Sequence, residues 1–487
     1  MSQDTPPDSN EPLDPSRRRV LIGIAAAATG LASQSSLASQ ARWTTPRDLV
    51  LPNPEESGID HIVVVMMENR SFDHMLGWVP GANGIQQGLS YADISGAAHP
   101  TFALVQDPAY GYQGCGFADP DHSYLAGRND YNNSLMDGFL KSQPLDDLFP
   151  IGYYTGSSVP FYAGCADHWT ICDRYHTGIL AGTLPNRIYM HSGQTDRLSD
   201  TLTISHLPTI WDSLIANKVT CKYYYGDTPV TALWGRKYLV KNPISRQMKH
   251  FVTDFGQHGQ PPAVSYVDPY MGVSVGETLG TSWDDHAFAD IRDGQCFLNF
   301  IYNVLRHSPA WERTLLVINY DEWGGFFDHV PPPLAPVSEA ETTLGNDGRL
   351  GIRVPCVLIG PRARRGYIEN TQFDPNSILN LIAWRFGVTA PGVRATTSIN
   401  LAAALDFNSP PNTSAPAFDV SYDGKIGPFP IKPPFLLPPL PPRNVFGGPC
   451  IKKTDSDRQP EINRRVEAHM SVLKALQELG RQSGAEI

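Results

Sequence analysis

The chain has 487 residues, of which 41% are hydrophobic and 18% are charged, and this composition argues against a disordered protein. Its formal net charge is −11, and no dense patch of lysine and arginine lies between aromatic residues, which argues against nucleic-acid binding. The same charge gives no reason to expect strong attraction to anionic membranes. The length provides enough material for a large core and for more than one structural unit.

The N-terminus has the pattern of a twin-arginine signal peptide, which we expect over residues 1–41. Arg17 and Arg18 precede a mild apolar run that ends near Ala32, too short to span a bilayer. Small residues at 36–38 fit a cleavage site, and an accidental basic cluster before an alanine-rich helix is the alternative. No later run is long enough for a membrane span, so we expect a soluble mature protein. It would be exported, periplasmic or secreted, by the twin-arginine translocase.

Residues 62–67 form a continuous apolar run rich in valine, which is typical of a strand buried on both faces of a parallel sheet. Glu68 and Asn69 follow where that strand would end, and ligands of open α/β sheets bind at this edge. Ser71 is expected to cap a short helix that runs to Met75. The carboxylate and amide oxygens of Glu68 and Asn69 are suitable ligands for a cation. A strand that ends in a solvated polar turn is the alternative.

Residues 86–162 are rich in Gly, Asp, Asn and Tyr without sustained periodicity, which favours a long insertion that shapes the substrate site. His122 lies within it, and a lone histidine in a loop is usually only solvated or hydrogen bonded. Thr183, followed by Pro185, resembles the start of a helix with threonine as its N-cap. The functional alternative is a nucleophilic hydroxyl beside a metal ion at a helix N-terminus, where phosphate is also favoured.

The middle of the chain predicts alternating helices and strands. Asp285 and His286 precede the last helix of this part. The expected elements are a helix over 209–217, a strand over 220–225, a loop-rich segment over 226–282 and a helix over 287–306.

A second buried strand is expected over residues 314–320, and it too ends in two oxygen ligands, Asp321 and Glu322. Asp328 and His329 follow within a few residues. Because both predicted strands end in acidic or amide pairs, we expect one metal site that is assembled from the two strand ends. Two unrelated strand ends are the alternative.

The last third of the chain predicts a strand over 356–360, a helix over 377–386 and a closing amphipathic helix over 461–479. The proline-dense segment 410–449 is expected to wrap the body as extended chain. The order of strands, helices and insertions favours an α/β layered sheet with large decorations.

Four sequence blocks carry a resemblance, in the order residues 68–77, 183–187, 321–330 and 351–355, the last with Pro361. Together they resemble the signature set of the bacterial phosphoesterase family that contains nonspecific phospholipases C and certain acid phosphatases. The resemblance implies an alkaline-phosphatase-like α/β/α sandwich with long loop insertions, which hydrolyses phosphate esters. We therefore expect a catalytic domain over residues 55–405, and a proline-rich wrap with a C-terminal helix over 406–487.

The resemblance also implies roles for individual residues. Thr183 would be the nucleophile and would lie beside one divalent metal ion, either Ca²⁺, Mg²⁺, Mn²⁺ or Zn²⁺. The implied metal ligands are Glu68, Asn69, Asp321, Glu322 and Thr183. The implied catalytic residues besides Thr183 are His122, His286, Asp328 and His329, and the implied substrate-binding residues are Asn69, Asn186, Arg187 and Asp285.

One position departs from the family pattern. Many relatives carry Asp-His-x-Ser after the arginine block, whereas this chain has Pro375 in place of the histidine. The change removes either a pocket histidine or a structural contact, so it bears on headgroup preference more than on the central chemistry.

The expected activity is that of an exported, metal-dependent phospholipase C that releases diacylglycerol. The first alternative is an acid phosphatase that acts on phosphomonoesters. The substrate would be a phospholipid for the phospholipase C and a small phosphate ester for the acid phosphatase. A non-catalytic exported protein that binds lipid or phosphate is an alternative of another class.

Overall fold

A computed structural model describes residues 50–106, 111–114, 117–272, 282–420 and 459–486 of the chain. The predicted signal peptide over residues 1–41 therefore lies outside the described residues, as does most of the proline-dense segment. The described residues 410–420 of that segment contain no helix or strand.

The core of the molecule is a mixed sheet of eight strands. These are β1 (His61–Met67), β6 (Thr170–Cys172), β7 (Cys221–Tyr225), β8 (Ser245–Gln247), β9 (Val264–Val267), β10 (Thr314–Tyr320), β11 (Val357–Ile359) and β12 (Tyr367–Glu369). Their order across the sheet is β12-β6-β11-β10-β1-β9-β7-β8. Neighbouring strands are parallel except where β11 pairs with β10 and β6. The carboxyl ends of β9, β1 and β10 therefore meet at one edge.

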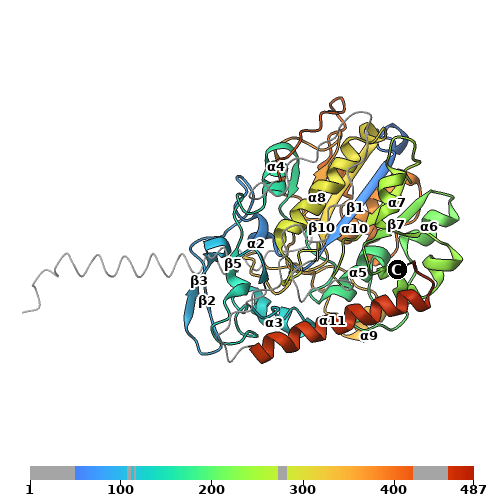
Figure 1. Cartoon of the computed structure of the whole chain (residues 1–487). Coiled ribbons are helices and arrows are strands. Elements are labelled where there is room, and N and C mark those ends of the chain that lie inside the picture. The colour runs from blue at the N-terminus through green and yellow to red at the C-terminus, as the bar shows by residue number, and fades with distance from the viewer. Residues whose placement is uncertain (1–49, 107–110, 115–116, 273–281, 421–458, 487) are drawn as a thin grey trace, which may run out of the picture. The chain divides into compact units, whose positions relative to one another are not determined.

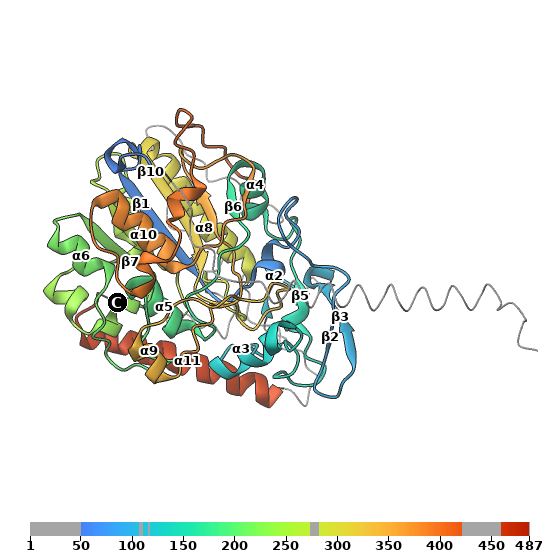
Figure 2. The same cartoon turned by 180° about the vertical axis from the view of Figure 1, so that it is seen from behind.

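Ten α-helices lie in the described part of the chain. They are α2 (Phe72–Leu76), α3 (Tyr124–Tyr131), α4 (Pro160–His168), α5 (Thr183–Ser192), α6 (Ile210–Ala216), α7 (Met248–Asp254), α8 (Ile291–Arg306), α9 (Glu339–Leu344), α10 (Pro375–Phe386) and α11 (Gln459–Gln482). Helix α8 lies in front of the sheet in Figure 1 and behind it in Figure 2, and α10 lies on the opposite face. Both faces of β10 are thus covered, which explains why all seven of its residues are buried. The predicted α/β class and its layered sandwich are confirmed.

The long insertion after α2 contributes no strand to the central sheet within its described residues. Its strands form two small sheets, in which β2 (Ser90–Ala92) pairs with β3 (Ala98–Pro100), and β4 (Phe102–Ala103) pairs with β5 (Gly152–Tyr153). The described part of the insertion therefore lies outside the central sheet, but the prediction that it is not core was wrong in part, because Phe149 and Tyr154 are buried in the main hydrophobic core.

Three local predictions were wrong. The segment 226–282 contains β8, α7 and β9 and is not merely loop-rich. Ser71 lies at the N-cap position of α2, but its hydroxyl donates to the carbonyl oxygen of Phe327, 2.6 Å away, and caps nothing. Thr183 is the first helical residue of α5, because Gly182 holds the N-cap position with extended backbone.

Candidate active site

Three neighbouring strands place a carboxylate at the same edge of the sheet. Glu68 follows β1, Asp321 follows β10, and the register that pairs Met67 with Tyr320 brings these two strand ends level. Asp268 follows β9, the other neighbour of β1. Glu68, Asp321 and Asp268 are all buried. The sequence prediction missed Asp268, which follows a strand of only four residues that includes Ser265, and which is itself followed by a proline and not by a second oxygen ligand.

Arg187 joins these three carboxylates. It lies one helical turn after Thr183 on α5, and residues four apart share a helix face. Its guanidinium nitrogens lie 3.0 Å from Asp321 Oδ2, 3.4 Å from Glu68 Oε2 and 3.2 Å from Asp268 Oδ2. Burial lowers the pKa of Arg187, but the three carboxylates outweigh it and raise the pKa above its ordinary value. Glu68 and Asp321 therefore belong to one charged cluster, in which Arg187 is an ion-pair partner.

The hydroxyl of Thr183 points into this cluster. Its Oγ1 donates to Glu68 Oε1 at 3.2 Å, and the residue is only 5% exposed. The N–H of Leu184 donates to Asp200 Oδ1 at 2.7 Å, so a carboxylate from another loop satisfies the first turn of α5. Thr183 is thereby left to interact with Glu68.

Asn186 shapes the loop that enters α5. Its side-chain amide donates to the carbonyl oxygens of Ala181, at 2.7 Å, and Gly182, at 3.1 Å. Its Oδ1 accepts from the N–H of Ile179 at 3.1 Å. The structure therefore places Asn186 as a residue that positions Thr183, with its amide engaged by backbone.

Asn69 and Glu322 present buried oxygens to the same cluster. Asn69 has φ of 60°, its N–H donates to Asp321 Oδ1 at 3.2 Å, and its side-chain amide is buried without a hydrogen-bond partner among the described residues. Glu322 accepts from the N–H of Gly324 at 2.6 Å through Oε2, while its buried Oε1 accepts no hydrogen bond within the described chain. Gly324 has φ of 65°, and a Cβ there would meet the carbonyl oxygen of Asn69 at 2.2 Å. Glycine is therefore required for this approach.

The side chains at these strand ends are of the types that bind a divalent cation, although among the described residues Asp321 and Glu322 do not join Glu68 in a group whose ligand atoms all lie within 4.8 Å of one another. Glu68, Asn69, Asp321 and Glu322 offer carboxylate and amide oxygens, the ligands that Ca²⁺, Mg²⁺ and Mn²⁺ prefer. Burial, with a contribution from Glu68, raises the pKa of Asp321 to about 8 against the lowering effect of Arg187. A cation among these oxygens would offset the excess negative charge and favour the ionised carboxylates. The orphaned oxygens of Asn69 and Glu322 would gain a partner.

Two of the predicted histidines lie beside the cluster. His122 Nδ1 lies 2.7 Å from the carbonyl oxygen of Pro120, and His122 Nε2 lies 3.9 Å from Glu322 Oε1. Burial lowers the pKa of His122, but Glu322 and nearby aspartates outweigh burial and raise the pKa to about 10. His286 Nε2 lies 3.7 Å from Asp119 Oδ2. Asp119, His122 and His286 offer ligand atoms within 4.8 Å of one another, so they form one polar group.

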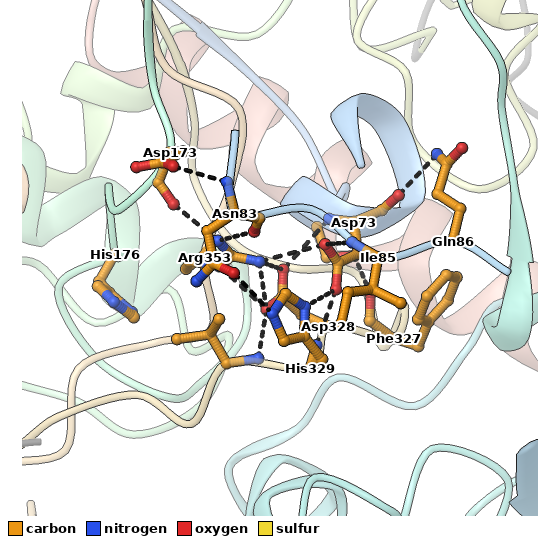
Figure 3. Close-up of polar contacts among 12 residues, drawn as sticks. Asp73, Asn83, Ile85, Gln86, Asp173, His176, Phe327, Asp328, His329 and Arg353 are labelled. Atoms are coloured by element: carbon orange, nitrogen blue, oxygen red, sulfur yellow. Dashed lines mark hydrogen bonds and ion pairs between the residues drawn. The ribbon is translucent and has the colours of Figure 1, made fainter. Parts of the chain in front are cut away.

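Asp328 and His329 contact a different set of residues, shown in Figure 3. The guanidinium of Arg353 pairs with Asp328, at 3.0 Å, and with Asp73, at 3.2 Å. His329 Nδ1 lies 2.5 Å from Asp73 Oδ2, and its Nε2 lies 3.1 Å from Asn83 Oδ1. Burial raises the pKa of Asp328 to about 6, against the lowering effect of Arg353. The network ties α2 to the loop that follows Glu322, and the structure does not bring Asp328 or His329 into contact with Thr183.

The contacts of Asp285 and Pro375 indicate structural roles for both residues. Asp285 Oδ2 accepts from the hydroxyl of Tyr320 at 2.6 Å, and burial raises the pKa of Asp285 to about 7. Pro375 is the first residue of α10, directly after its N-cap Asp374. Proline suits that helical position, because its missing N–H would have no intrahelical partner there. Pro375, the residue that departs from the family pattern, therefore helps to start helix α10.

Besides Asp268, the sequence prediction did not single out Asp200 or His469. Asp200 lies in a loop before α6, where nothing local distinguishes it. His469 lies on α11, and its ring stacks on His286 with 3.8 Å between centroids and 19° between planes. A lone histidine in an amphipathic helix carries no sequence signal for such a contact.

Comparison with known proteins gives the class that this site belongs to. The sequence model described as Phosphoesterase family matches residues 59–389, which span the sheet edge and all four sequence blocks. The chain belongs to the phosphoesterase family. It is a hydrolase that acts on phosphoester bonds.

Individual relatives agree with this assignment. Phospholipase C A of Mycobacterium tuberculosis is 30% identical over 420 residues, which cover 74% of this chain and 79% of that protein. Non-specific phospholipase C1 of Arabidopsis thaliana is 32% identical over 366 residues, which cover 67% of each chain. Among solved structures, a protein in the alkaline phosphatase superfamily from Vibrio parahaemolyticus has a TM-score of 0.32 and 11% identity, covering 67% of this chain and 83% of that chain. That score is too low to decide the fold, which rests on the sheet order.

Proposed function

We propose that this hydrolase is a metal-dependent phospholipase C that cleaves the phosphodiester of a phospholipid and releases diacylglycerol, with Thr183 as its nucleophile. The observation that carries the proposal is the position of the Thr183 hydroxyl, 3.2 Å from Glu68 Oε1 at the edge of the sheet where the oxygen ligands gather. The names of the relatives, phospholipases C of Mycobacterium tuberculosis and Arabidopsis thaliana, support a phospholipid substrate.

A divalent cation bound by Glu68, Asn69, Asp321 and Glu322 would lower the pKa of the Thr183 hydroxyl and offset the charge of the phosphoryl group.

The chemistry would proceed in two displacements at phosphorus. In the first, the Thr183 hydroxyl gives its proton to Glu68, the acceptor of its hydrogen bond, as Oγ1 bonds to phosphorus and the bond to the diacylglycerol oxygen breaks. His122 or His286, in its protonated form, supplies a proton to the departing oxygen. In the second, water attacks phosphorus and the same histidine accepts the water proton. The bond between phosphorus and Thr183 Oγ1 breaks, Oγ1 takes its proton back from Glu68, and the phosphorylated headgroup is released. Arg187 keeps the carboxylates in place, since it contacts Glu68, Asp268 and Asp321.

The test is to measure product release from phosphatidylcholine, sphingomyelin and p-nitrophenyl phosphate in parallel, with each cation and with a chelator. We expect diacylglycerol from phosphatidylcholine, lost on chelation and restored by one of the four cations. Hydrolysis of p-nitrophenyl phosphate without diacylglycerol would favour an acid phosphatase. A protein that binds lipid or phosphate and hydrolyses none of the three would be the non-catalytic alternative.

We also propose that the protein is exported through the twin-arginine translocase, to the periplasm or beyond. The support is the Arg17-Arg18 pair with its short apolar run in the sequence. Within the described residues, no helix combines the length and apolar character that crossing a bilayer requires.

A further inference from the structure

Helix α11 lies beyond residues 59–389, the part of the chain that the family model matches. Its C-terminal half is anchored to the body. Leu473 and Leu476 are buried against the core, and Gln477 Nε2 donates to the carbonyl oxygen of Asp227 at 3.1 Å. This half packs beside the short helix η6 (Val230–Trp234). Figures 1 and 2 both show α11 running from there towards α3.

The N-terminal half of α11 reaches the loops of the active site. Arg465 donates from Nη1 to the carbonyl oxygen of Asp119 at 2.7 Å, and from Nη2 to the carbonyl oxygen of Ser142 at 3.2 Å. Asp119 is the carboxylate beside His286 and His122. One arginine therefore fastens the helix to the loop that carries a predicted catalytic histidine.

A cavity of about 370 Å³ lies between α11 and these loops. One wall is α11, with Arg464, Arg465, Ala468, His469 and Val472. The other wall is formed by residues 119–124, Gly182 and residues 198–200. Because Gly182 directly precedes Thr183, the cavity lies beside the proposed nucleophile, and α11 forms one of its walls.

His469 extends from this wall into the charged cluster. Its ring stacks on His286, and Glu68, His286 and His469 offer ligand atoms within 4.8 Å of one another. Glu68 is the residue that accepts the hydrogen bond of Thr183. The C-terminal helix thus places an imidazole at the point where a phosphoryl group would meet Thr183.

We propose that α11 completes the substrate cavity and that His469 binds the phosphoryl group of the substrate, a role that rests on the proposed function. A phosphate ester needs donors for the oxygens that a cation does not hold. Arg187 is engaged by three carboxylates, whereas His122, His286 and His469 surround the approach to Thr183 with ring nitrogens. His469 is therefore a third imidazole in the phosphate site, supplied by a part of the chain outside the family region.

The size of the cavity specifies which part of the substrate it holds. Pockets for drug-sized ligands measure about 300–1,000 Å³. At about 370 Å³ the cavity has room for a phosphorylated headgroup but not for two long acyl chains as well. The chains of a lipid substrate would stay outside α11.

The experiment titrates inorganic phosphate into the mature protein in the presence of each of Ca²⁺, Mg²⁺, Mn²⁺ and Zn²⁺, by calorimetry. His469→Phe keeps a stacking ring and removes the nitrogens, and we expect its phosphate Kd to rise at least tenfold with the melting temperature unchanged. His469→Gln, which restores an N–H donor, should recover part of the affinity. Lys474→Ala, an exposed position on the same helix, is the matched control and should bind phosphate like the wild type.

A second variant tests the helix itself. Arg465→Ala removes the contacts to Asp119 and Ser142, so it should weaken phosphate binding when His469 is present and have little further effect in His469→Phe. Wild-type phosphate affinity in His469→Phe, or a wild-type protein that binds no phosphate, would overturn the inference. Phosphate binding that depends on His469 in a protein that hydrolyses no ester would instead overturn the proposed function and leave the site standing.

Discussion

Replacing Thr183 by alanine separates a structural role from a chemical one. Thr183 is not the N-cap of α5, and within the described residues its side chain makes one hydrogen bond, to Glu68. Loss of a hydrogen bond to a charged group costs about 1.5–3 kcal/mol. Glu68 keeps its contact with Arg187, so we expect a cost at the low end of that range and a fold that persists. If Thr183 is the nucleophile, activity should fall by a factor on the order of 10⁴–10⁶.

The assay compares diacylglycerol release with the free energy of unfolding for Thr183→Ala and Thr183→Ser. Serine restores a hydroxyl without the β-methyl that fixes the rotamer, so it should recover part of the rate. Thr209→Ala is the matched control, because Thr209 is a true N-cap that accepts from the N–H of Asp212. That variant should lose about 1–3 kcal/mol of stability, because it removes both the cap and the hydrogen bond to the Tyr238 hydroxyl, and should keep its turnover.

Mass spectrometry of acid-quenched enzyme should find added phosphate on the peptide that contains Thr183. Near wild-type hydrolysis by Thr183→Ala would refute the reasoning, and direct attack by water with His286 as the base would replace it.

Four further predictions concern other parts of the chain. Glu322→Gln should weaken cation binding by about 10–100-fold in a metal titration while the protein stays folded, and unchanged affinity would remove Glu322 from the ligand set. Asp328→Asn should lower the free energy of unfolding by about 3–5 kcal/mol, because it leaves Arg353 partly unpaired, and metal affinity should stay near wild type. Unchanged stability with weakened metal binding would instead make Asp328 a residue of the metal site. Arg17→Lys combined with Arg18→Lys should leave the protein in the cytoplasm, and unchanged export would show that the N-terminus is misinterpreted. Burial lowers the pKa of His191 to about 3, so only the unfolded chain binds its proton between pH 3 and 6.5. Stability should fall as pH falls through that window, by about 1.4 kcal/mol per pH unit for this residue, and a His191→Phe variant with the same slope of unfolding free energy against pH would contradict the assignment.

The strands that carry the site were predictable because their signal is local. β1 and β10 are each seven residues long, are mostly apolar and are followed directly by oxygen-bearing side chains, so period and composition suffice. β9 is only four residues long and lies in a stretch rich in glycine and proline, which hides the same pattern before Asp268. Short buried strands depend on their neighbours more than on their own sequence.

The assembly of the site was only partly predictable. Glu68 and Asp321 could be paired from the rule that ligands bind at the carboxyl edge of a sheet. The separation of Asp328 from Thr183 could not be predicted, because it depends on Arg353. This arginine pairs with Asp328 and lies 25 residues further along the chain. His469 reaches the site only through the packing of α11 on the body, which no local pattern encodes.

The contacts of Arg187 have a consequence for how the protein acquires its cation. Buried carboxylates that lack a counter-ion repel one another and oppose folding. Here a covalently attached positive charge already lies among Glu68, Asp268 and Asp321. We therefore expect the chain to reach its native state before any ion arrives, and the ion to exchange without unfolding the protein.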